Sequence, residues 1–177
     1  MLGVIDLLIV QGLLGAYDVL WHHEWKERLP ERPQAMCEQK LHGSRELLYA
    51  VVFIGIAWWE WHGTLAWLLA FVLVVEMLLT AWDFVEEDRS RRLSPTERVT
   101  HLILSMNGGA YLALLFSHWL AWSRQPSGLI AADYGLRSWA LTVLGIGVFV
   151  WGLRDCLSGW RPSTQTAAVR ARLAGEV

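Results

Sequence analysis

The strongest constraint on this chain is a series of apolar segments, each about as long as a lipid bilayer is thick. A helix needs about 20 apolar residues to cross a hydrocarbon core of about 30 Å. Tryptophans lie at nearly every end of these segments, which is typical of the aromatic belts at membrane interfaces. We therefore expect an all-α, polytopic helical bundle with about five transmembrane helices. The five segments are Leu2–Trp21, Leu47–Trp61, Thr64–Trp82, Val99–Trp122 and Ser138–Leu157.

The composition excludes several classes of protein. Of the 177 residues, 54% are hydrophobic and 18% are charged, whereas ordinary soluble domains carry about 25% charged residues. The chain is too apolar for an ordinary soluble domain and far too apolar for a disordered one. Its net charge of −2 offers no electrostatic basis for binding nucleic acid. Membrane lipid is the first partner that we expect.

The lysines and arginines predict the orientation of the bundle. Of the fifteen, only Arg124 and Arg137 fall in the second and fourth connections between the apolar segments. By the positive-inside rule, the N-terminus is outside and the C-terminus is cytoplasmic. We expect residues 1–161 to form one transmembrane domain in a bacterial inner (plasma) membrane, with 162–177 as a mobile cytoplasmic tail. The first segment has no basic region before it and is expected to be a retained span.

Local signals indicate where the helices begin and end. Pro30 and Pro33 are expected to end the first helix and begin the second. Gly63 allows a tight turn between the second and third helices. The sequence Ser94-Pro95-Thr96-Glu97 is a capping box, which starts the fourth helix near Pro95. We therefore expect helices over about 33–61 and 64–92 that extend beyond the apolar segments on the cytoplasmic side, and an external loop over 124–135.

The carboxylates and histidines are spaced so that they share helix faces. Residues four apart lie on the same face of a helix. We call each such row of carboxylates and histidines an acidic stripe. Counted from the outer end of each span, the acidic stripes all reach the same depth, about 30 Å from the outer boundary. We expect them to converge at the cytoplasmic interface. The predicted metal ligands are Asp18, His22, Glu38, His42, Glu46, Asp83, Glu87, Glu97 and His101.

A cluster of this kind requires a source of positive charge. Carboxylates that are buried together must become protonated, pair with arginine, or bind cations. Carboxylates and imidazoles on the helices of a bundle form the ligand set of dinuclear iron and manganese proteins. Hard oxygen ligands with imidazole suit iron, manganese or zinc. The sequence therefore predicts two divalent metal ions, with iron favoured because the ligands are rich in carboxylate.

At the ligand-bearing stretches, the chain resembles membrane-bound di-iron carboxylate/histidine enzymes. The resemblance covers Asp18–His23, Glu38–Glu46, Asp83–Asp88 and Glu97–His101, with the spacing Glu-x-x-x-His. It implies a metal-dependent membrane oxidoreductase that acts on a lipid-like or isoprenoid substrate. Oxygen-dependent hydroxylation or desaturation is the reaction type implied by iron, with a redox partner as the source of electrons. The residues do not identify a catalytic acid, base or nucleophile.

Several polar residues near the predicted ligands are candidates for supporting them or relaying protons. Of two adjacent histidines, His22 is preferred as a ligand because Asp18 lies four residues before it. Glu76 lies in the middle of a span, where an ionisable side chain is costly and indicates function. Gly108 and Gly109 are interpreted as sites of close helix packing. The supporting candidates are Gln11, His23, Tyr49, Glu76 and Asn107.

Three other functions remain open at this stage. Zinc in the same site would favour a membrane hydrolase, because a zinc-bound water ionises near neutral pH. A b-type haem carrier would use His42 and His101 as an inner pair of haem ligands and His62 and His118 as an outer pair. A cation transporter would line an ion path with Glu76 and the acidic stripes.

Overall fold

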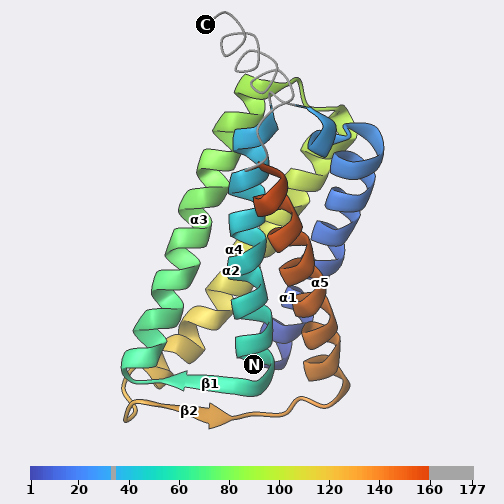
Figure 1. The fold of residues 1–177 in the computed structure, drawn as a ribbon. Coiled ribbons are helices and arrows are strands. Elements are labelled where there is room, and N and C mark those ends of the chain that lie inside the picture. The colour runs from blue at the N-terminus through green and yellow to red at the C-terminus, as the bar shows by residue number, and fades with distance from the viewer. Residues whose placement is uncertain (33–34, 160–177) are drawn as a thin grey trace, which may run out of the picture.

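The computed structural model describes residues 1–32 and 35–159, and these form a bundle of five α-helices (Figure 1). Two short helices follow the first: a π-helix, η1 (Asp18–Lys26), and a 3-10 helix, η2 (Leu29–Glu31). Two short strands, β1 (Trp59–His62) and β2 (Gly128–Ala131), lie at one end of the bundle. The α-helices are α1 (Leu2–Tyr17), α2 (Met36–Trp58), α3 (Thr64–Ser90), α4 (Pro95–Trp122) and α5 (Leu136–Gly159).

Four of the helical segments are long and apolar enough to cross a membrane. They are α1 continued through η1, and α3, α4 and α5. All five expected helices are present, but α2 is less apolar than the others, because it carries the acidic stripe from Glu38 to Glu46 together with Lys40 and Arg45. In Figure 1, α2 runs through the middle of the bundle. It packs against α3 and α5 and therefore does not need an apolar surface on every side.

The predicted boundaries of the third and fourth helices agree closely with the structure. The capping box is present, because the Ser94 hydroxyl accepts from the Glu97 backbone N–H and the Glu97 side chain accepts from the Ser94 backbone N–H. Gly63 turns the chain with a φ of 59°. A Cβ there would lie only 2.5 Å from Oγ of Ser127, so both backbone and space require glycine.

The two strands were not predicted. The chain leaves helical geometry at Trp59, so the helix expected over 33–61 is observed only from Met36 to Trp58. Residues 33 and 34, and the expected tail 162–177, lie outside the described part of the chain. The segment expected as an external loop contains β2, which pairs antiparallel with β1. The sheet closes the end of the bundle opposite the acidic stripes (Figure 1).

The first helix changes geometry at Asp18, where its α-helix continues as a π-helix to Lys26. A π-helix has more residues per turn than an α-helix, and such segments often occur at functional sites. Asp18, His22 and His23 all become buried as a result. The apolar core lies nearer the strand end and includes Ile5, Phe53 and Tyr111.

Candidate metal centre

Buried carboxylates gather at the end of the bundle opposite the strands. Eight of them are at most 5% exposed. Two histidines, His22 and His23, are equally buried, and the side chains of His42 and His101 are only 12% and 11% exposed. The structure thus brings together all nine predicted ligands. The eight carboxylates belong to Asp18, Glu38, Glu46, Glu76, Asp83, Glu87, Glu97 and Asp155.

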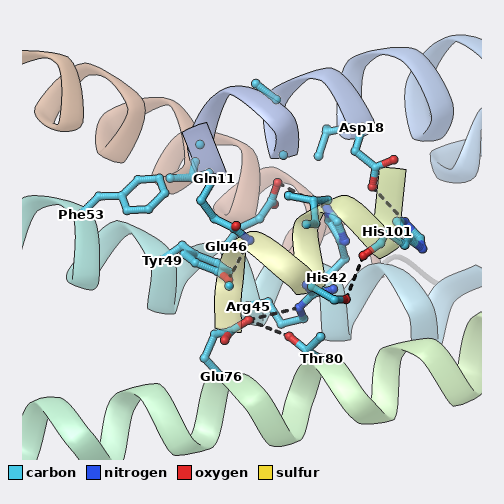
Figure 2. Close-up of a pocket in the computed structure, with 18 of the residues that line it drawn as sticks. Gln11, Asp18, His42, Arg45, Glu46, Tyr49, Phe53, Glu76, Thr80 and His101 are labelled. Atoms are coloured by element: carbon cyan, nitrogen blue, oxygen red, sulfur yellow. Dashed lines mark hydrogen bonds and ion pairs between the residues drawn. The ribbon is translucent and has the colours of Figure 1, made fainter. Parts of the chain in front are cut away.

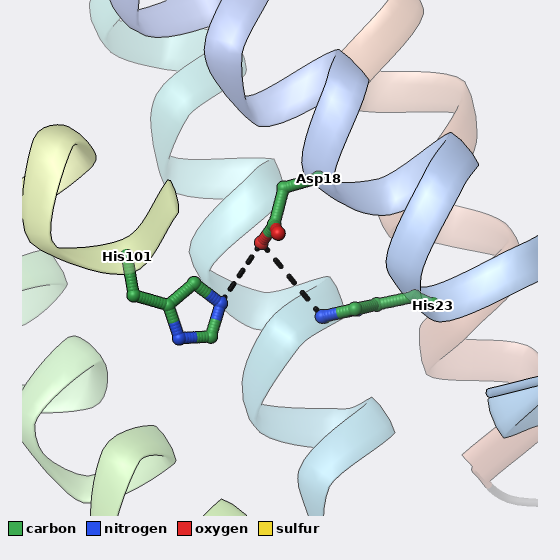
Figure 3. A group of neighbouring side chains, drawn as sticks. All are labelled: Asp18, His23 and His101. Carbon is green, nitrogen blue, oxygen red and sulfur yellow. Dashed lines mark hydrogen bonds and ion pairs between the residues drawn. The ribbon is translucent and has the colours of Figure 1, made fainter. Parts of the chain in front are cut away.

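One group of potential ligand atoms joins η1 to α4, and we call it the Asp18 group. It consists of Asp18, His23 and His101, whose ligand atoms lie within 4.8 Å of one another. Figure 3 shows both imidazoles directed at the Asp18 carboxylate. Oδ2 of Asp18 lies 3.0 Å from Nε2 of His101 and 3.8 Å from Nε2 of His23. The second nitrogen of His101 lies 3.4 Å from Oε2 of Glu87.

The contacts of the two adjacent histidines favour a different ligand from the one that their spacing favours. Both nitrogens of His22 have partners: Nδ1 lies 2.7 Å from Asp18 and Nε2 lies 3.3 Å from Oγ1 of Thr96. Nε2 of His23 is buried and has no hydrogen-bond partner. The π-helix accounts for this, because a turn of more than four residues brings His23 back to the face that carries Asp18. The geometry favours His23 as the ligand and His22 as the residue that orients Asp18.

A second group, the Asp155 group, joins α2 to α5. It consists of His42, Glu46 and Asp155, again with ligand atoms within 4.8 Å of one another. The helices approach closely there, since a Cβ on Gly43 would lie 2.8 Å from the carbonyl oxygen of Gly152. Sequence reasoning missed Asp155, although it lies near the end of the fifth apolar segment that was expected to be cytoplasmic, at the depth where the other acids converge.

Arg91 compensates the carboxylates on one side of the centre. Its guanidinium donates to both oxygens of Glu97, at 3.0 and 2.7 Å, and its Nε donates to Glu38 at 3.0 Å. Glu87 lies 3.9 Å away. Burial disfavours the charged guanidinium, but the bonds to Glu97 and Glu38 outweigh it and raise the pKa of Arg91 above its ordinary value. Glu38 and Glu97 are therefore held by arginine and lie outside both ligand groups.

Arg45 compensates carboxylates on the side of the centre that faces the cavity. It donates to Oδ2 of Asp83 at 2.5 Å, and its Nε lies 3.6 Å from Glu76. Glu76 also accepts from the hydroxyl of Thr80 at 2.6 Å. The mid-span glutamate is thus paired with arginine and threonine. Asp83 additionally lies 3.7 Å from Nδ1 of His42, which places it beside the Asp155 group.

Unpartnered polar atoms are concentrated in this cluster. Ten buried side-chain nitrogen or oxygen atoms of the described residues have no hydrogen-bond partner. Leaving such an atom unsatisfied costs about 1–3 kcal/mol, and metal ligation is one way to satisfy several of them together. Seven of the ten belong to predicted ligands or to His23: Nε2 of His23, both ring nitrogens of His42, both carboxylate oxygens of Glu46, Oδ1 of Asp83 and Oε2 of Glu87.

The charges of the cluster also indicate that it needs a further source of positive charge. Three arginines, Arg45, Arg91 and Arg154, pair with six of the eight buried carboxylates. The other two, Asp18 and Glu46, lie against histidines. The carboxylates therefore outnumber these arginines by a wide margin. Protonation of carboxylates and histidines, or bound divalent cations, would have to compensate the rest.

A cavity of about 580 Å³ leads from the cluster into the bundle. Figure 2 shows side chains of both ligand groups at one end and Phe53 at the other. Gln11 donates to the Tyr49 hydroxyl at 3.2 Å and accepts from Asn107 at 2.8 Å. These three predicted supporting residues thus form a polar chain beside the cavity. The remaining lining is mostly apolar side chains and glycine.

The histidines proposed for an outer haem pair lie at the strand end. Nε2 of His62 lies 3.0 Å from Glu60, and Nε2 of His118 lies 2.7 Å from the amino group of Met1. Their inner counterparts, His42 and His101, belong to different ligand groups. Three of these four histidines, His42, His62 and His101, thus lie beside carboxylates.

Comparisons with models of protein families, with curated proteins and with solved structures found no match to this chain. Its function must therefore be inferred from the site.

Proposed function

We propose that this protein is an integral-membrane metalloenzyme with a dinuclear carboxylate/histidine centre. The observation that carries the proposal is the convergence of two ligand groups, the Asp18 group and the Asp155 group, within one buried acidic cluster. The ring centroids of His23 and His42 lie 4.5 Å apart and connect the groups. Iron is the metal we favour, because carboxylate oxygens and imidazoles make up the whole ligand set.

The Asp18 and Asp155 groups would each hold one metal ion, with Glu87 and Asp83 close enough to join or bridge them. The geometry supports this arrangement, since Glu87 lies beside His101 and Asp83 lies beside His42. His22 would fix the orientation of Asp18, as residues behind metal ligands commonly do. Arg91 and Arg45 would keep the surrounding carboxylates ionised and in place.

The cavity supports an apolar substrate. It extends from His101 and Glu46 toward Phe53 and Leu144, through a mostly apolar part of the bundle. A lipid-like or isoprenoid molecule could therefore place a carbon atom near the centre while its chain stays out of water. The side chains that surround the cavity would hold that carbon in position and exclude bulk water during the reaction.

The proposed reaction is an oxygen-dependent oxidation, either hydroxylation or desaturation. A di-iron centre supplies the activation of dioxygen for such chemistry. Hydroxylation of a C–H bond by dioxygen also consumes two electrons and two protons and releases one water molecule. A redox partner that delivers electrons at the cytoplasmic face is thus part of the proposal.

Elemental analysis of protein purified without chelator tests the proposal. We expect about two iron ions per chain, and loss of most of this metal in the double variant Asp18→Asn, Glu46→Gln. The matched control Glu60→Gln changes a carboxylate at the strand end and should keep its metal. A result of two zinc ions per chain would contradict the proposed oxidation and favour zinc-dependent hydrolysis. Substoichiometric metal in the wild-type protein would contradict the proposal.

The proposed location is a bacterial inner membrane, with the acidic centre at the cytoplasmic side. Four long apolar helices support insertion, and exposed basic residues such as Arg28, Arg89 and Arg92 lie at the end of the bundle that holds the centre. Cys37 lies there too and is exposed. In a Cys156→Ser background, a membrane-impermeant maleimide should label Cys37 only from the cytoplasm. A cysteine at Gln125, at the opposite end, should show the reverse pattern in a background without other cysteines.

A further inference from the structure

From the exposed lining residues of α3 and α4 we infer that the cavity opens sideways between these helices. These helices contact each other near the strands, where Trp67 and Trp119 lie edge to face with ring centroids 4.6 Å apart. They contact again near the acidic centre, where Phe84 stacks on His101 at 5.4 Å. Between these two contacts, the cavity is lined by partly exposed residues from both helices. They are Met77, Thr80 and Ala81 of α3, and Ser105, Gly108 and Gly109 of α4.

Two adjacent glycines keep this opening wide. Glycine in the middle of a helix costs about 1 kcal/mol relative to alanine, so a pair of them needs a structural reason. Close helix packing, the interpretation from sequence, is not the reason. A Cβ on Gly109 would meet nothing within 4 Å, and one on Gly108 would meet only Tyr111, at 4.0 Å. Both residues instead border the cavity, where any larger side chain would occupy its space.

Two buried donors near the acidic end of the cavity have no hydrogen-bond partner. They are the indole N–H of Trp151 and the Nε–H of Arg45, and both residues line the cavity. The Nε of Arg45 lies 3.6 Å from Glu76, an ion-pair distance that is longer than a hydrogen bond. Trp151 lies one helical turn from Asp155, beside the Asp155 group. A ligand that satisfies these donors must present an acceptor, such as the oxygen of a hydroxyl or carbonyl group.

The charge of the surroundings restricts that acceptor further. Asp18, Glu46, Glu76 and Glu87 also line the cavity, and arginines only partly compensate the cluster. A carboxylate or phosphate head group would be repelled by these side chains. The acceptor should therefore be uncharged. The cavity volume of about 580 Å³ lies in the range for a single small ligand.

We propose that the cavity binds a single-chain lipid with an uncharged oxygen-bearing head group, which enters from the bilayer between α3 and α4. The head group accepts hydrogen bonds from Trp151 and Arg45, and the chain lies along Gly108 and Gly109. This inference rests on the proposed function only in naming its substrate class, because the binding itself requires no metal.

Photolabelling in lipid nanodiscs tests the proposal. The probe is a long-chain alcohol with a diazirine in the middle of its chain, and the comparison probe is the fatty acid of equal length. We expect the alcohol to label cavity residues such as Leu104 and Leu112, in competition with unlabelled alcohol. The acid should label them at least severalfold less. Labelling confined to lipid-facing residues, or equal labelling by the acid, would overturn the proposal.

Two variants with matched controls locate the binding. Gly109→Phe should abolish cavity labelling, whereas Ala110→Phe, at the neighbouring exposed position outside the cavity lining, should not. Trp151→Phe removes one hydrogen-bond donor and should weaken labelling by about two- to tenfold, whereas Trp139→Phe on the same helix should leave it unchanged. Unchanged labelling in Gly109→Phe or in Trp151→Phe would contradict the assigned path or head-group contact.

Metal content measured on the same samples separates the two proposals. Stoichiometric metal without cavity labelling would overturn the lipid assignment alone. Cavity labelling in a protein without metal would overturn the proposed function alone.

Discussion

The imidazole rings of His23 and His42 lie with their centroids 4.5 Å apart, although the two residues belong to different helical segments. His23 belongs to the Asp18 group and His42 to the Asp155 group. The two groups are therefore neighbours within one centre. A dinuclear site is the simplest arrangement in which both groups hold a cation, and it is the basis of the predictions below.

The roles that we propose for the adjacent histidines can be tested by paired variants. His23→Ala should remove one metal ion per chain, because it deletes a ligand of the Asp18 group. His22→Ala should keep both ions but weaken metal affinity by about 10–100-fold, the usual effect of losing a residue that orients a ligand. Metal titration monitored by elemental analysis distinguishes them. The reverse result would show that His22 is the ligand.

Asp155→Asn should remove the metal ion of the Asp155 group and leave that of the Asp18 group. The amide keeps the shape of the side chain but lacks the negative charge of a carboxylate ligand. Asp133→Asn, at a residue outside both groups, is the matched control and should keep two ions per chain. Two ions in Asp155→Asn would remove this residue from the proposed ligand set.

Arg91→Met should destabilise the protein strongly. Glu38, Glu87 and Glu97 would remain buried without their shared guanidinium, and breaking a buried ion pair by removing one partner costs about 3–5 kcal/mol. Thermal unfolding in detergent measures the effect. The exposed neighbouring residue provides the control Arg92→Met, which should change stability by less than about 0.5 kcal/mol. Equal effects of the two variants would contradict the role given to Arg91.

Metal should stabilise the folded protein, and a chelator should reverse the effect. Ligand at a free concentration of 100 times its dissociation constant stabilises the state that binds it by about 2.7 kcal/mol. This increment should decrease as the pH falls, because protons compete with metal for imidazole and carboxylate. Unfolding curves with and without chelator at several pH values provide the measurement. In the variant His42→Ala, the increment should be smaller than in the wild-type protein.

The sequence predicted the parts of the fold that depend on local chemistry. The capping box at Ser94 and the turn at Gly63 were located correctly, because capping and a positive φ are properties of a few neighbouring residues. The convergence of acids from separate helices was also anticipated, since helical rise converts residue counts into depth. The predicted ligands therefore lie in one cluster, although their binding of metal remains a prediction.

Features that depend on tertiary packing were missed. The π-helix from Asp18 places His23 on the face that carries Asp18, and no local pattern in the sequence predicts it. The pairing of β1 with β2 depends on contacts between segments far apart in the chain. Asp155 was not singled out in the sequence, and it joins the cluster because α2 and α5 approach closely at Gly43.

The most direct test of the dinuclear centre is anomalous X-ray scattering from crystals of the protein purified without chelator. Data collected above and below the iron absorption edge should show two anomalous peaks per chain, one at the Asp18 group and one at the Asp155 group, that disappear below the edge. Peaks at another metal's edge would change the identity of the metal and the reaction. The absence of any anomalous peak within the acidic cluster would contradict the account.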